Sequence, residues 1–168
     1  MAIRLNNESV ISEWSTMILN AAGHEEKLLE GVVGRITFAE MPKVYFNYSE
    51  VETGGIFAKM KRRFLICENE GFRDFRFFIG AFPYGKHLNA CYYLGCSPGI
   101  LKGMFAESRT GSEKGFSMPT NILAQQELSA WQSVVHSCVL GAVDEVVGIT
   151  DGDPAKIKRE SRGFLQLW

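Results

Sequence analysis

Aromatic and other apolar residues of this chain concentrate between Arg62 and Cys96, in runs that are separated by residues that favour turns. Two clusters of such residues, Asn69 to Phe72 and Pro83 to Lys86, interrupt runs of aromatic and β-branched side chains. Short breaks of this kind between such runs are typical of β-hairpins. The pattern therefore predicts three antiparallel strands, near Phe57 to Glu68, Arg73 to Phe82 and His87 to Gly95.

A loop of four residues in each hairpin predicts which side chains share a face of the sheet. It pairs Phe82 with His87 and Glu68 with Arg73, and side chains then alternate between the two faces. One face would be nearly pure hydrocarbon and would carry Phe64, Ile66, Phe75, Phe77, Tyr92 and Leu94. The other face would mix cations with aromatic rings: Lys59, Lys61, Arg63, Arg76, Phe78, Phe82, His87, Asn89, Cys91 and Tyr93. A slip of one residue in either hairpin would change this division.

A long helix is predicted in the C-terminal half, from about Thr120 to Val147. Apolar residues recur there with a period of 3.6 residues: Leu123, Leu128, Trp131, Val135, Cys138, Val139, Ala142 and Val146. Such a helix spans roughly 40 Å at 1.5 Å per residue. Since neighbouring strands lie about 4.8 Å apart, it is long enough to cross a five-stranded sheet, and we expect it to cover the hydrocarbon face.

At the N-terminus, apolar residues at helical spacing predict a helix from about Glu8 to Ala22. They are Val10, Trp14, Met17, Ile18 and Ala21. The shorter segments suggest an edge strand or tail at Ala2 to Leu5, a helical turn at His24 to Gly31, strands at Val32 to Phe38, Val44 to Val51 and Ile100 to Ala106, and a charged helix at Pro154 to Arg162.

Together these elements predict a single α+β domain over residues 1–168. Its core would be an antiparallel β-meander of five or six strands packed on the long helix, with the N-terminal helix alongside. The polar segment from Glu107 to Ser117 reads as a mobile loop, and the apolar tail from Phe164 to Trp168 is expected to dock on the body or on a second subunit. The order of elements resembles helix-grip ligand-binding domains in architecture, without a matching motif.

Composition narrows the functional classes. A formal net charge of −1 argues against a dedicated nucleic-acid binder, which needs a surplus of cations to meet phosphate. The four cysteines are widely spaced and no apolar run resembles a signal peptide or a membrane span. We therefore expect a cytoplasmic protein with reduced thiols and no leader.

The cationic and aromatic face is the candidate ligand site. Its expected ligand-binding residues are Lys59, Lys61, Arg63, Arg76, Phe78, Phe82, His87 and Tyr93. Cations beside rings suit an anionic ligand with a planar part, because the charge meets the ammonium or guanidinium group while the ring stacks. Two alternatives remain open: the face is buried by a second subunit, or it is a solvated surface with lysine stems lying over the rings.

Other motifs do not support metal or catalytic chemistry. On a strand His87 and Cys91 lie about 13 Å apart, too far to share a zinc ion or to act as a base and nucleophile. Asp151 to Asp153 reads as a helix cap, and Gly111 to Gly115 lacks the lysine position of a phosphate-binding loop. We expect no metal, no cofactor and no assigned catalytic residue.

Three functional hypotheses follow. The first is a homodimeric module that binds a small anionic or aromatic molecule. The second is a structural or protein-interaction subunit whose sheet face is buried in an oligomer interface. The third is an enzyme of unknown class, with catalytic residues that converge from separate loops.

Overall fold

The computed structural model describes residues 3–4, 10–53, 60–96 and 122–163. Four sequence expectations lie outside these ranges: the strand at Ile100 to Ala106, the loop at Glu107 to Ser117, the tail at Phe164 to Trp168, and the placement of Lys59.

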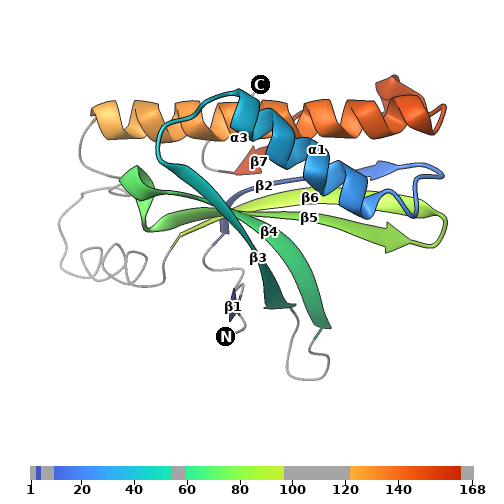
Figure 1. The fold of residues 1–168 in the computed structure, drawn as a ribbon, viewed down its shortest axis with the longest axis horizontal. Helices are drawn as coiled ribbons and strands as arrows, with labels where there is room; N and C mark the ends of the chain where they lie inside the picture. The colour runs from blue at the N-terminus through green and yellow to red at the C-terminus, as the bar shows by residue number, and fades with distance from the viewer. Residues whose placement is uncertain (1–2, 5–9, 54–59, 97–121, 164–168) are drawn as a thin grey trace, which may run out of the picture.

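An antiparallel sheet and two α-helices form the described fold, which confirms the expected α+β class (Figure 1). The helices are α1 (Glu25–Phe38) and α3 (Ile122–Ile149), and short 3₁₀ turns are η2 (Glu70–Phe72) and η3 (Pro154–Lys156). The long strands are β2 (Val10–Ile18), β3 (Val44–Thr53), β4 (Met60–Asn69), β5 (Phe75–Tyr84) and β6 (His87–Cys96), and the short ones are β1 (Ile3–Arg4) and β7 (Arg162–Gly163). The sheet order is β1-β3-β4-β5-β6-β2-β7, and β1 pairs with β3 in parallel.

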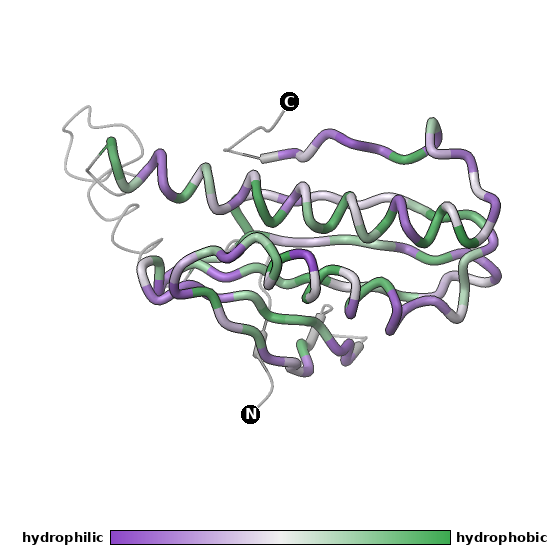
Figure 2. The backbone as a smooth tube through the Cα atoms, turned by 45° about the horizontal axis from the view of Figure 1, so that its top comes forward, coloured by the Kyte–Doolittle hydropathy of each residue, from purple (hydrophilic) through white to green (hydrophobic). Residues whose placement is uncertain are grey.

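Both helices cover one face of the sheet, and α1 lies beside α3 (Figure 1). Along α3 apolar and polar residues alternate (Figure 2), and the apolar ones supply most of its buried positions. Trp131 of α3 packs its ring edge against Phe77 at 5.0 Å between centroids, and Phe77 in turn packs against Tyr92 at 5.6 Å. The predicted long helix and the burial of Phe75, Phe77, Tyr92 and Leu94 beneath it are therefore confirmed.

By length and composition alone, α3 is apolar enough to cross a membrane. Half of its most apolar stretch of 18 residues is buried inside the protein. Its buried residues face the sheet cluster that contains Trp14, Phe77 and Tyr92.

The predicted helix from Glu8 to Ala22 is wrong, because residues 10–18 form strand β2. Ser12, Trp14, Thr16 and Ile18 are buried while the residues between them are exposed, which is the period of two of a half-buried strand. Trp14 lies opposite Tyr92 of β6. Two of the four inward positions are hydroxyl residues, Ser12 and Thr16. The alternation of apolar and polar residues that marks a strand is therefore missing from the sequence.

Helix α1 replaces two other predicted elements. The expected turn at His24 to Gly31 and the expected strand at Val32 to Phe38 form one helix of 14 residues. Leu28, Leu29, Val32 and Ile36 are buried on a single side, and their spacing is that of a helical stripe. The alternation of apolar and polar residues from Val32 to Phe38 extends over too few residues to distinguish a strand from a helix.

The C-terminal helix predicted at Pro154 to Arg162 is also wrong beyond its first turn. Asp153 does cap that turn, since its Oδ1 accepts a hydrogen bond from the Ala155 amide at 3.0 Å. After Lys156 the chain is extended and reaches β7, which pairs with β2. We call residues 153–163 the C-terminal strap.

Replacement of Phe77 by alanine tests the core. The Phe77 side chain is fully buried between the sheet and α3, so Phe77→Ala leaves a cavity and is expected to lower the free energy of unfolding by about 3 to 5 kcal/mol. Urea denaturation measures the change. Tyr84→Ala is the control, because Tyr84 is 73% exposed and its loss should cost no more than about 0.5 kcal/mol. Equal effects would contradict this description of the core.

Candidate functional site

The pairing of β4 with β5 decides which side chains lie on the face away from the helices. Glu68 pairs with Arg76 rather than with Arg73, a shift of three residues from the predicted register. An odd shift exchanges the two faces of β4. Lys61 and Arg63 therefore lie on the helix side, opposite Arg76, and their expected place on the cationic face is wrong. Phe64 and Ile66 likewise move to the face away from the helices.

Asn69 accounts for the longer connection. Its Oδ1 accepts a hydrogen bond from the Gly71 amide at 2.8 Å and caps η2, and its Nδ2 donates to the Pro42 carbonyl at 3.2 Å. The connection thus holds five residues, from Glu70 to Asp74. The predicted four-residue loop placed Asn69 inside the turn instead of at the end of β4.

The β5–β6 hairpin differs from its prediction by two residues. Tyr84 pairs with His87 across a two-residue turn, Gly85 and Lys86. Gly85 has a φ of +61°, a conformation that glycine adopts without strain. Because an even shift keeps the faces, Phe78, Phe82, His87 and Tyr93 remain on the predicted face.

Aromatic rings gather around Phe64 on this face. Phe64 meets Phe78, Phe82 and Tyr93 edge to face, with ring centroids 6.4, 5.1 and 6.3 Å apart. We call these four rings, together with Arg62 and Cys91, the aromatic face. Ring contacts of this geometry add to the stability that burial provides.

Arg62 is the cation that the aromatic face presents. Its guanidinium carbon lies 4.6 Å from the centroid of the Phe82 ring, and the side chain is partly buried. Within the described part of the chain Arg62 forms no ion pair. By contrast, Arg63 contacts Glu26 at 3.2 Å and stacks on Tyr48, and Arg76 contacts Glu68 at 3.7 Å.

Two of the predicted ligand residues do not join Arg62. Arg76 lies opposite Glu68, six positions along β4 from Arg62, so the backbone positions of the two arginines are roughly 20 Å apart along the strand. His87 lies at the hairpin end, where its Nδ1 accepts a hydrogen bond from the Asn20 amide at 3.1 Å. The structure thus brings Phe78, Phe82 and Tyr93 together with Arg62, a residue that the predicted register had assigned to the other side.

Burial favours the neutral forms of Cys91 and Tyr93 on the aromatic face. It raises the pKa of the Cys91 thiol to about 11 and that of the Tyr93 hydroxyl to about 12. Burial also raises the pKa of Cys67 to about 12. At pH 7 these thiols are protonated and poor nucleophiles, while the Tyr93 hydroxyl can donate a hydrogen bond. Cys91 is therefore poorly suited to nucleophilic chemistry at pH 7.

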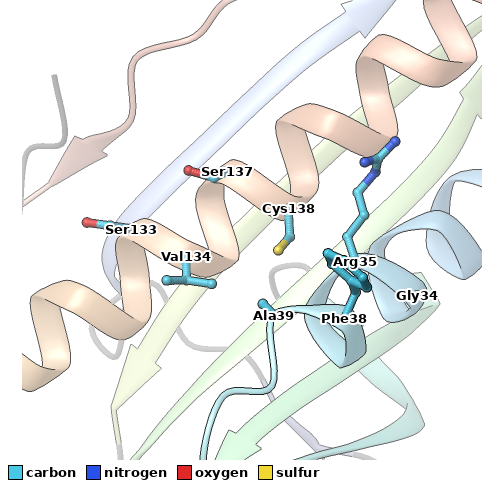
Figure 3. Close-up of a pocket in the computed structure, with 8 residues that line it drawn as sticks. All are labelled: Gly34, Arg35, Phe38, Ala39, Ser133, Val134, Ser137 and Cys138. Atoms are coloured by element: carbon cyan, nitrogen blue, oxygen red, sulfur yellow. The ribbon is translucent and has the colours of Figure 1, made fainter.

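A hollow of about 520 Å³ lies elsewhere, between α1 and α3 (Figure 3). Its lining residues are Gly34, Arg35, Phe38, Ala39, Ser133, Val134, Ser137 and Cys138. Val134 is shared with a second hollow of about 430 Å³, whose walls include Met41, Phe72 and Trp131. The pair of hollows forms a largely apolar groove along α3. The charged residues that line the two hollows are Arg35, Lys43 and Glu127, and Arg35 pairs with Glu145 at 3.3 Å.

No group of three or more His, Cys, Asp or Glu residues in the described ranges is placed to hold a metal ion. Comparisons with protein-family models, curated proteins and solved structures find no match for this chain. The functional argument therefore depends on the geometry of the site.

Gly80 leaves room for the rings of the aromatic face, and the substitution Gly80→Ala tests this packing by adding one methyl group. A Cβ at Gly80 would lie 2.7 Å from Cζ of Phe82 and 2.9 Å from Cε1 of Phe64, so one of these rings must move. We expect Gly80→Ala to lower the free energy of unfolding by about 1 to 3 kcal/mol. Thermal or urea unfolding measures the change.

Gly34→Ala is the matched control. Gly34 lies within α1 and a Cβ there meets nothing within 4 Å, so alanine should stabilise the protein by about 0.5 to 1 kcal/mol. A neutral effect of Gly80→Ala would show that the rings do not pack over Gly80 in solution.

Proposed function

We propose that this protein binds a small molecule that carries one negative charge and a flat apolar part, and that the aromatic face is the binding site. The observation that supports the proposal is Arg62, a partly buried guanidinium group stacked on Phe82 that forms no ion pair among the described residues. A cation in such a position is partly desolvated, which strengthens its attraction for an anion.

The neighbouring groups suit the rest of such a ligand. Tyr93 is partly exposed, and its neutral hydroxyl can donate a second hydrogen bond to the anion. The rings of Phe82 and Tyr93 offer apolar surface for a planar group. Because Arg76 is distant and paired with Glu68, Arg62 is the one cation of the site among the described residues, which favours a monoanion such as an aryl carboxylate or sulfonate.

Two dyes that share a ring system test the proposal. 1-Anilinonaphthalene-8-sulfonate carries a negative charge, and N-phenyl-1-naphthylamine is its neutral counterpart. We expect Arg62→Gln to weaken binding of the sulfonate about tenfold or more, since a hydrogen bond to a charged group contributes about 1.5 to 3 kcal/mol. Binding of the neutral amine should change little. Fluorescence titration measures both affinities.

Arg63→Gln is the control variant. Arg63 is the next residue in β4 and carries the same charge, but it lies on the opposite face, paired with Glu26. This change should leave both dye affinities as they are. An equal loss of sulfonate affinity in the two variants, or no loss in Arg62→Gln, would count against the aromatic face as the binding site.

We propose self-association as a second function on separate grounds. Phe38 is 90% exposed, and it lies on the wall of the hollow between α1 and α3 (Figure 3). A projecting ring beside an apolar hollow on one surface is self-complementary, as a two-fold dimer requires. Ile122 and Leu123, 73% and 63% exposed, extend the apolar character of α3 at its N-terminal end.

Light scattering at micromolar concentration tests this second proposal. The wild-type chain should have the mass of two chains, and Phe38→Asp should have the mass of one, because a carboxylate cannot enter an apolar hollow without a large desolvation cost. Tyr84→Asp is the control: Tyr84 is similarly exposed but lies at the far hairpin, so its variant should remain dimeric. A wild-type protein with the mass of one chain would refute the dimer.

A further inference from the structure

Residues 153–163, the C-terminal strap, run beside β2 and are attached to the body mainly through side chains of the body. The indole of Trp14 donates to the Lys158 carbonyl at 2.8 Å, and the Lys158 amide donates to Thr16 Oγ1 at 3.1 Å. Within the described residues, two residue pairs join β7 to β2 in the sheet. Among the described side chains of the strap, Ile157 and Ser161 are buried.

His136 of α3 links this strap to the core. Its Nε2 lies 2.8 Å from the Arg159 carbonyl oxygen, and its Nδ1 lies 3.0 Å from the Tyr92 hydroxyl. A carbonyl can only accept, so Nε2 carries the proton of the neutral ring and Nδ1 accepts from Tyr92. Trp14 and Tyr92 also pack their rings against the imidazole, with centroids 5.9 and 5.7 Å away. The ring is thus enclosed by β2, β6 and the strap.

Among the described residues, no side chain in contact with His136 carries a negative charge that would neutralise an imidazolium. Trp14 of β2 and Tyr92 of β6 contact the imidazole, and both are uncharged. Gln132 lies one turn earlier in α3 and donates to Ser12 Oγ, and these two side chains are uncharged as well. The strap carries Lys158, Arg159, Glu160 and Arg162, of which the Glu160 side chain is exposed to solvent. Asp144, two turns further along α3, is held by the Arg159 guanidinium through two hydrogen bonds of 2.8 and 3.2 Å.

We propose that the strap is a pH-controlled latch: protonation of His136 opens it and uncovers the outer edge of β2. The sheet and α3 supply many residues of the large core cluster, whereas the strap supplies Ile157 alone among its described residues. The strap is therefore the neighbour of the ring whose departure exposes the least apolar surface. Its predominantly polar character is visible in Figure 2. An uncovered strand edge presents unpaired backbone groups to which another strand can add.

The direction of the pH effect follows from burial. Burial lowers the pKa of His136 below its ordinary value of 6.5, and the hydrogen bond to Arg159 only partly offsets this. The open state, in which water reaches the ring, regains the ordinary pKa and therefore binds the proton more tightly. The closed latch is favoured above pH 6.5. As the pH falls from 6.5 toward the pKa of the closed state, the open fraction rises by up to about tenfold per pH unit.

Hydrogen exchange of the full chain, measured by mass spectrometry between pH 7.5 and 5.5, tests the latch. After correction for intrinsic exchange rates, protection of the strap amides should fall between pH 6.5 and 5.5, by up to about fivefold. Amides of β5 and β6 should keep their protection. Constant protection of the strap, or a parallel fall in β5 and β6 that reveals global unfolding, would overturn the proposal.

Two variants assign the effect to His136. In His136→Gln the side chain still offers a donor and an acceptor but does not titrate, so strap protection should become independent of pH. His87→Gln should behave as the wild type, because His87 bonds to the Asn20 amide and not to the strap. A pH response that persists in His136→Gln would exclude His136 as the trigger. If His136→Gln does not fold, the pH dependence of amide protection in the wild type, compared between the strap and β5 and β6, is the test of the latch.

Discussion

The hydrogen bonds of Asn69 lie at the turn that sets the register of β4 against β5, on which the composition of both sheet faces depends. These bonds cap η2, so that β4 ends at Asn69, one residue later than the predicted four-residue turn requires. The longer connection sets the pairing of β4 with β5. Side chains alternate along a strand, so this register decides which of the adjacent arginines, Arg62 or Arg63, faces the helices. Arg63 thereby enters an ion pair with Glu26 of α1, while Arg62 lies on Phe82 on the opposite face.

Both faces of the central strands are apolar, and the two sides are stabilised differently. On the helix side Phe77 and Tyr92 pack under α3 in one large cluster. On the other side Phe64 holds a smaller cluster of rings, and Gly80 leaves space for them. The large cluster serves stability. The small one carries a cation that forms no ion pair among the described residues, and this difference is the reason to place binding on that face.

The sequence predicts the parts of the fold whose periodicity is long or strongly marked. The long helix, the three central strands and the burial of Phe75 and Phe77 follow from patterns that extend over many residues. Strand β2 was misread as a helix because its inward positions include Ser12, whose hydroxyl bonds to the strap more than 100 residues later. A partner so distant leaves no local signal.

The same limit applies to the candidate site. The sequence places Phe78, Phe82 and Tyr93 on one face correctly, because an even error in a hairpin register leaves each side chain on the same face of the sheet. Arg62 could not be predicted as a site residue, since a turn that is one residue longer exchanges the two faces of β4. The signal that was available is Asn69 directly before Glu70-Gly71, a common arrangement for an asparagine that caps a turn with its own side chain.

The register of β4 against β5 can be measured directly by nuclear Overhauser contacts between backbone protons across the two strands. The structure predicts contacts between Cys67 and Phe77 and between Glu68 and Arg76. Contacts between Phe64 and Phe77 and between Glu68 and Arg73 would instead return Arg63 to the face away from the helices, and would remove the basis for the binding site.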